Sequence, residues 1–129
     1  MFVLKTAQIQ HFIAADENEL VDVIAKSIRL ANGTRVASYD DKELGSMVKI
    51  GIARARTHGL TRAEAIAAFV AVMFEIAPRF DEQVEINEVL KDERFAPEVR
   101  LSQLFDRVTD AAWIEAQKKY EDSFWFTDD

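Results

Sequence analysis

The sequence predicts an all-α fold, with one compact multi-helix domain over residues 1–129 and about seven helices around a buried central helix at residues 62–77. The main observation is the run Ala65–Ala77, in which every residue except Glu75 is apolar. A helix that is apolar on nearly every side must be buried on nearly every side. Because the run is shorter than the roughly 20 residues that cross a bilayer, we expect amphipathic helices to enclose it. No segment shows a convincing strand pattern.

Two helices are expected before residue 40. Thr6 can cap the first, and the second runs from Asn18 to Leu30, after which Asn32-Gly33 is a typical helix end. Segment 34–39 contains β-branched residues but is short, and we expect a loop there. Apolar residues recur at helical spacing in both helices. They are Ile9, Phe12 and Ile13 in the first, and Leu20, Val23, Ile24 and Ile28 in the second.

Local signals bound the third helix on both sides. Asp40 followed by Glu43 has the spacing of a capping box, in which two side chains satisfy backbone amides at a helix start. His58-Gly59 is a typical end, because glycine readily adopts the left-handed conformation that follows many helices. Gly51 lies inside this helix, where glycine costs about 1 kcal/mol relative to alanine. Its presence predicts the close approach of a neighbouring helix.

Similar signals divide the second half of the chain. Thr61 and Glu64 have capping-box spacing and predict the start of the central helix. A short acidic helix is expected over Val84–Lys91, Pro97 suits the first turn of the next helix, and Thr109 can cap the last. The expected apolar faces of these last two helices are Leu101, Leu104, Phe105 and Val108, and then Trp113, Ala116 and Tyr120.

The net charge of −7 is unevenly distributed. Residues 61–129 contain 16 acidic and 8 basic residues, whereas residues 1–60 are nearly balanced. An acidic half repels phosphate groups and anionic lipid, so we expect no nucleic-acid partner and no membrane. It would suit a basic protein partner, although acidic surfaces also serve simply to keep proteins soluble. The absence of cysteine and of an apolar leader favours a cytoplasmic protein.

Residue chemistry predicts no catalytic residues, no metal and no cofactor. His11 and His58 are each interpreted as structural, because sequence shows neither a carboxylate partner nor a cleft for them. Glu82, Glu85 and Glu88 recur at three-residue spacing, but the Glu-x-x-His pattern of helical di-iron sites is absent. A solvated acidic face is the simpler interpretation. The alternative is a metal-dependent enzyme that uses the acidic cluster 81–93.

Glu75 interrupts the apolar run of the central helix. A carboxylate in such a helix must reach solvent or find a cation. The candidate cations are Arg54, Arg56 and Arg79. Burial of such a pair would more often fix the fold than perform catalysis.

The expected partner-binding surface combines charge with aromatic anchors. Acidic residues would steer a basic partner, while aromatic residues would supply buried contacts. The aromatic triplet at the C-terminus either packs back on the core or forms an exposed patch that marks a partner site. The residues assigned to this surface are Asp81, Glu82, Glu85, Glu88, Trp113, Tyr120, Phe124, Trp125 and Phe126.

Several short stretches between residues 6 and 106 resemble a set of small uncharacterised helical proteins encoded beside type VI secretion and polymorphic-toxin genes of Gram-negative bacteria. The stretches are Ile50-Gly51-Ile52-Ala53-Arg54-Ala55, His58-Gly59-Leu60-Thr61, Phe69–Phe74, Phe80-Asp81, Val89-Leu90-Lys91-Asp92, and Arg100-Leu101-x-x-Leu104. The C-terminal helix and the Phe124-Trp125-Phe126 tail lie outside the resemblance, which carries over no catalytic residue.

The resemblance implies a context of effectors, their loading adaptors and their immunity proteins. Together with the acidic half and the missing catalytic set, it predicts a non-catalytic, protein-binding accessory of a bacterial toxin or secretion system. This accessory would be an immunity protein or an effector adaptor that acts by direct binding. Its expected partner is the cognate effector or toxin protein, with a basic surface.

Overall fold

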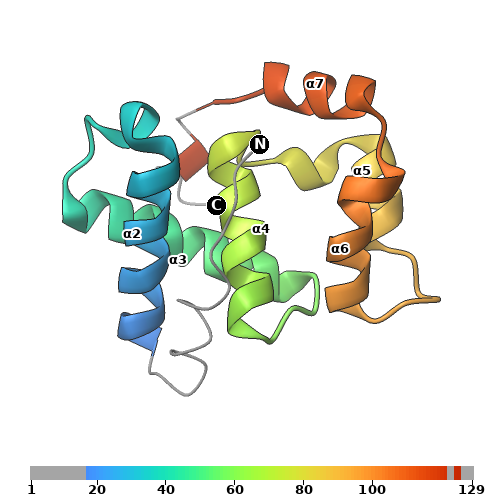
Figure 1. Cartoon of the computed structure of the whole chain (residues 1–129), viewed down its shortest axis with the longest axis horizontal. Helices are drawn as coiled ribbons and strands as arrows, with labels where there is room; N and C mark the ends of the chain where they lie inside the picture. Colours follow the sequence, from blue (N-terminus) through green and yellow to red (C-terminus); the bar gives the residue numbers. More distant parts are fainter. Residues whose placement is uncertain (1–16, 122–123, 126–129) are drawn as a thin grey trace.

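The computed structural model describes residues 17–121 and 124–125, which form helices, turns and loops without any strand (Figure 1). The described residues contain six α-helices, and a short 3₁₀ helix lies at Phe80–Glu82. The elements are α2 (Glu17–Val36), α3 (Asp41–Thr57), α4 (Ala63–Glu75), η1 (Phe80–Glu82), α5 (Val84–Leu90), α6 (Pro97–Arg107) and α7 (Asp110–Lys118). The predicted all-α class is confirmed for these residues. Six α-helices are found where about seven were expected, and the helix expected after Thr6 lies outside the described residues.

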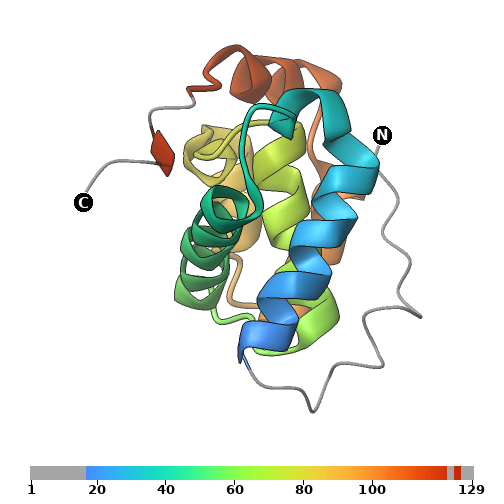
Figure 2. The ribbon, with the colours of Figure 1, turned by 90° about the vertical axis from the view of Figure 1, so that its left-hand side faces the viewer.

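Helix α4 packs against α2, α3 and α6, while α7 lies across the end at which α4 finishes (Figures 1 and 2). Ten of its 13 residues are buried, as the apolar run predicts. Gly51 of α3 allows close contact with α4, because a Cβ atom at this position would lie 3.0 Å from Cγ2 of Val70. None of the described helices is both long and apolar enough to cross a membrane.

The boundaries of α3 match the sequence prediction. The Asp40 carboxylate accepts a hydrogen bond from the Glu43 amide (2.7 Å), and the Glu43 carboxylate accepts one from the Asp40 amide (3.0 Å). At the other end His58 is the C-cap and Gly59 has φ +84°. An L-residue at position 59 would be strained by this backbone and would also bring its Cβ 2.9 Å from Pro97.

The predicted end of α2 at Asn32-Gly33 is a break in helical geometry within the helix rather than its last residue. Asn32 departs from helical geometry (φ −133°, ψ 38°), but the helix resumes and continues to Val36. Val36 is buried in the core, and Arg35 donates hydrogen bonds to the backbone carbonyls of Phe74 and Glu75. These tertiary contacts hold the extra turn, so Asn32-Gly33 produces a kink where a helix end was expected.

The predicted capping box at the start of α4 is also wrong. Arg62 is the N-cap and makes no side-chain cap, while Glu64 pairs with Arg62 (2.8 Å). The Thr61 amide instead donates to the carboxylate of Glu98 in α6 (3.1 Å). A contact from another helix therefore replaces the local one.

The last two helices begin at the residues that the sequence indicates. Pro97 is the first residue of α6, and the Thr109 hydroxyl accepts a hydrogen bond from the Ala112 amide to cap α7. One expectation fails, because Phe105 is 42% exposed and does not belong to the buried face of α6.

Candidate functional site

Most carboxylates of the acidic segment contact groups of the chain itself. Asp81 is only 4% exposed and binds Arg54 and His58, so the expectation that it lies on a binding surface is wrong. Glu82 is exposed but pairs with Arg54 (2.9 Å). Glu88 is exposed and forms no ion pair within the described residues. The segment therefore offers a partner much less free negative charge than its sequence indicates.

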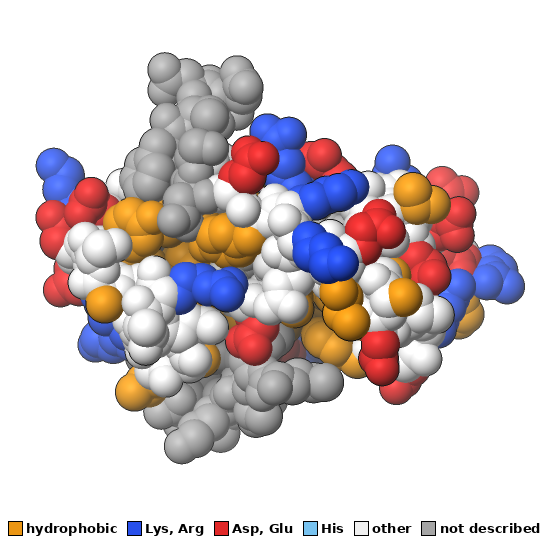
Figure 3. Space-filling model, turned by 90° about the horizontal axis from the view of Figure 1, so that it is seen from above, with side chains coloured by type: hydrophobic (Ala, Val, Ile, Leu, Met, Phe, Trp, Pro, Cys, Tyr) orange, Lys and Arg blue, Asp and Glu red, His pale blue; other side chains and the backbone are white. Residues whose placement is uncertain are grey.

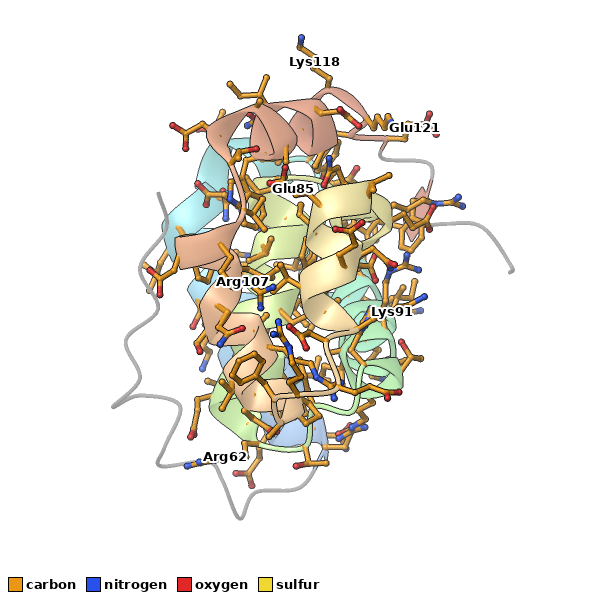
Figure 4. All side chains as sticks on the ribbon, turned by 90° about the vertical axis from the view of Figure 1, so that its right-hand side faces the viewer. Arg62, Glu85, Lys91, Arg107, Lys118 and Glu121 are labelled. Carbon is orange, nitrogen blue, oxygen red and sulfur yellow. The ribbon has the colours of Figure 1, made fainter. Side chains whose placement is uncertain are left out.

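Glu85 has a structural contact that the sequence does not reveal. Its carboxylate accepts hydrogen bonds from the amide (2.6 Å) and the hydroxyl (3.2 Å) of Thr109, at the start of α7. Figure 4 shows Glu85 on α5 close to the turn between α6 and α7, and Arg107 directed from α6 toward α5. Arg107 binds the carboxylate of Asp92 (3.1 Å). These contacts tie the α6–α7 corner to α5.

A largely buried cluster of Arg54, His58 and Asp81 joins α3 to η1. Arg54 donates from Nη2 and Nε to the two carboxylate oxygens of Asp81, over 2.7–3.1 Å. Nε2 of His58 donates to Oδ2 of Asp81 at 2.7 Å, because an ionised carboxylate can only accept. Burial alone would raise the pKa of Asp81, but the hydrogen bonds from His58 and Arg54 outweigh it and hold that pKa below its ordinary value.

The stability contribution of Asp81 should be lost in acid. The unfolded chain titrates Asp81 near its ordinary pKa of about 3.9, and the folded pKa is lower. The contribution is therefore complete above the unfolded pKa and disappears as the pH falls through the folded pKa. Urea unfolding of the wild type and Asp81→Asn, from neutral pH to about pH 2, should show the two stabilities converging below about pH 4. A gap that stays constant over this range would contradict the assignment.

The C-terminal aromatic residues pack on the core as far as the structure describes them. Trp125 is 2% exposed and stacks on Phe74 with a ring-centroid distance of 4.5 Å, so it cannot serve as an exposed anchor. Phe124 is partly buried, with the guanidinium groups of Arg54 and Arg79 over its ring. Phe126 lies outside the described residues. The prediction that Trp125 lies on an exposed partner-binding surface is therefore wrong. The alternative, that the C-terminal aromatic residues pack back on the core, holds for Trp125.

Phe124 and Glu82 both line a pocket of about 540 Å³, so two parts of the predicted surface do meet. Arg79, Lys118 and Lys119 also line it, so its charge is mixed. Figure 4 shows the Lys118 side chain pointing away from the body of the protein. Tyr120, also assigned to the predicted surface, lies under the guanidinium of Arg35 and contacts the indole of Trp125.

A second hollow, termed the α6–α7 cleft, is more uniform than the first in the chemical character of its lining residues. Its volume is about 300 Å³, and its apolar lining comes from α4, α6 and the start of α7. Phe105 and Trp113 face each other there with nearly parallel rings, 12° apart and 5.9 Å between centroids. The residues that line it are Val72, Glu75, Ile76, Phe105, Val108, Asp110 and Trp113. Of the residues assigned to the predicted surface that the structure describes, only Trp113 lines this cleft.

The charged groups of this cleft are all acidic. Neither Glu75 nor Asp110 forms an ion pair within the part of the chain that the structure describes, and no Lys or Arg lines the cleft. The sequence indicated that Glu75 must meet solvent or a cation, but it could not indicate that Phe105 and Trp113 would lie beside it. Figure 3 looks onto α7 and shows apolar patches among charged side chains on this face.

No group of three or more His, Asp or Glu side chains is arranged to hold a metal ion among residues 17–121 and 124–125. Comparison of the chain with family models, curated proteins and solved structures finds no match.

Proposed function

We propose that this protein is a protein-binding accessory of a bacterial toxin or secretion system, either an immunity protein or an effector adaptor. It acts in the cytoplasm by direct binding to its cognate effector or toxin, without catalysis. The sequence resemblance supplies this context. The observation that supports binding is the α6–α7 cleft, where Phe105 is 42% exposed beside two carboxylates that form no ion pair within the described residues.

Burial of the cleft by a protein partner is expected to be favourable in free energy. An aromatic pair left partly in water loses the free energy that burial would provide, and aromatic residues are enriched in the buried centres of interfaces. The surrounding negative charge attracts a basic partner and raises its association rate. By contrast, an enzyme that uses the carboxylates 81–93 receives little support, because Asp81 and Glu85 accept hydrogen bonds from the protein's own groups.

The test uses the proteins encoded beside this gene, each co-expressed with the tagged wild type and then measured by calorimetry. Phe105→Ala should weaken binding about tenfold or more, since buried aromatic anchors each contribute more than about 1.4 kcal/mol. Leu30→Ala is the matched control, because Leu30 is 83% exposed but lies on α2 and outside the cleft. The Leu30→Ala variant should bind the partner with the same affinity as the wild type.

Failure of every neighbour-encoded protein to bind the wild type would contradict the proposed function. Equal loss of affinity in Phe105→Ala and Leu30→Ala would contradict the role of the cleft. If co-expression protects cells from the bound protein's toxicity, the chain is an immunity protein. If the bound protein is not neutralised but requires the chain for export, the chain is an adaptor.

A further inference from the structure

We propose that the α6–α7 cleft recognises an arginine side chain of the protein partner. The guanidinium pairs with Glu75, and its flat face lies against the Phe105–Trp113 pair. This inference rests on the proposed protein-binding function and adds the chemical group that is recognised.

The position of Glu75 is unfavourable for the isolated protein. Glu75 is the last residue of α4, and the C-terminal end of a helix carries partial negative charge that destabilises a carboxylate. Arg35 approaches this end but donates to the backbone carbonyls of Phe74 and Glu75, at 2.7 and 3.0 Å. Within the described residues, no Lys or Arg side chain pairs with the Glu75 carboxylate itself.

The three arginines that the sequence indicated as possible partners of Glu75 all contact other residues. Arg54 binds Asp81 and Glu82, Arg56 binds Glu17, and Arg79 lies over the ring of Phe124. Asp110 also lines the cleft, but as the first residue of α7 it is stabilised by the positive end of that helix. Of the two carboxylates that line the cleft, Glu75 is therefore the one for which the described residues provide no stabilising contact.

The size and shape of the cleft favour a single side chain. Its volume of about 300 Å³ lies at the lower end of ligand pockets, which span roughly 300–1,000 Å³. This space suits one or two side chains better than a large cofactor. The nearly parallel rings of Phe105 and Trp113 present flat aromatic surface next to Glu75.

Arginine fits this combination better than lysine does. Its guanidinium is planar, stacks on aromatic faces and can donate two parallel hydrogen bonds to one carboxylate. A lysine ammonium is a compact, strongly hydrated charge that cannot stack. The partner is therefore expected to present an arginine between apolar residues.

The test titrates three peptides into the ¹⁵N-labelled full chain and follows the indole signal of Trp113. The probes are acetyl-Leu-Arg-Leu-amide and its analogues with lysine or citrulline, a neutral isostere of arginine. The arginine peptide should bind about tenfold more tightly than the citrulline peptide, as expected for a hydrogen bond between charged groups. The lysine peptide should bind with intermediate affinity.

Glu75→Gln should weaken binding of the arginine peptide about tenfold, because it removes the charge but keeps the shape. Glu88→Gln makes the same change on an exposed residue outside the cleft and should leave affinity unchanged. Melting curves of both variants confirm that they are folded. Equal affinities for arginine and citrulline, or an unaffected Glu75→Gln, would overturn the inference. So would a concentration-dependent dimer that buries Trp113 and excludes the peptide.

Binding of the partner encoded by a neighbouring gene distinguishes failure of the arginine inference from failure of the proposed protein-binding function. If that partner binds Glu75→Gln as tightly as the wild type while Phe105→Ala loses binding, the arginine inference fails and the protein-binding function stands. If no partner binds but the peptides discriminate through Glu75, the function fails and the recognition chemistry stands.

Discussion

Replacing Phe74 by alanine should lower the free energy of unfolding by about 3–5 kcal/mol. Phe74 lies on α4, is fully buried and stacks against Trp125. Truncation removes the apolar contacts of the ring and leaves a cavity that close-packed neighbours can only partly fill. The loss should be large because α4 has neighbours on most of its sides, and α2, α3 and α6 cannot all move inward together.

Urea unfolding followed by circular dichroism measures this change. Val84→Ala is the control, since Val84 is 70% exposed, and its effect should stay within about 0.5 kcal/mol. A loss for Phe74→Ala below about 1 kcal/mol, the average for any point substitution, would show that α4 is not the centre of the fold.

Replacing Arg54 by methionine should destabilise the protein by about 3 kcal/mol, the lower end of the range for breaking a buried ion pair. Methionine keeps much of the apolar stem but leaves the Asp81 carboxylate, 4% exposed, without its bidentate cation. His58 continues to donate one hydrogen bond to Asp81, which limits the loss.

Arg56→Met provides a matched control on the same helix. Arg56 pairs with Glu17, but both side chains are about half exposed, and surface pairs contribute only about 0–1 kcal/mol. Adding Asp81→Asn to Arg54→Met should recover part of the stability, because the unpaired buried charge is then removed. If Arg54→Met costs no more than Arg56→Met, the cluster does not stabilise the junction of α3 and η1.

The sequence predicts helix ends correctly where local contacts decide them. Asp40 and Glu43 form the expected capping box through two hydrogen bonds between residues only three positions apart. Thr61 and Glu64 have the same spacing, but Glu98 of α6 takes the Thr61 amide. The two patterns cannot be distinguished locally, since the difference comes from a residue 37 positions away.

The candidate site was only partly predictable for the same reason. The sequence identified Trp113 as a possible anchor and Glu75 as a carboxylate that must reach solvent or find a cation. It did not indicate that the two residues line one cleft. It counted Asp81 and Glu85 as free surface charge, whereas Arg54, His58 and Thr109 bind them across 23 to 27 positions of sequence. A charge count gives the number of carboxylates. The contacts made in the folded protein determine which of them remain available to a partner.

The most direct measurement of the central claim uses the two tryptophans of the chain as probe and internal reference. Trp113 lines the α6–α7 cleft, whereas Trp125 is buried against Phe74. Addition of the neighbour-encoded partner to the ¹⁵N-labelled protein should shift the indole signal of Trp113 strongly and that of Trp125 little. If the partner binds and the Trp113 signal keeps its position, the α6–α7 cleft is not the binding surface.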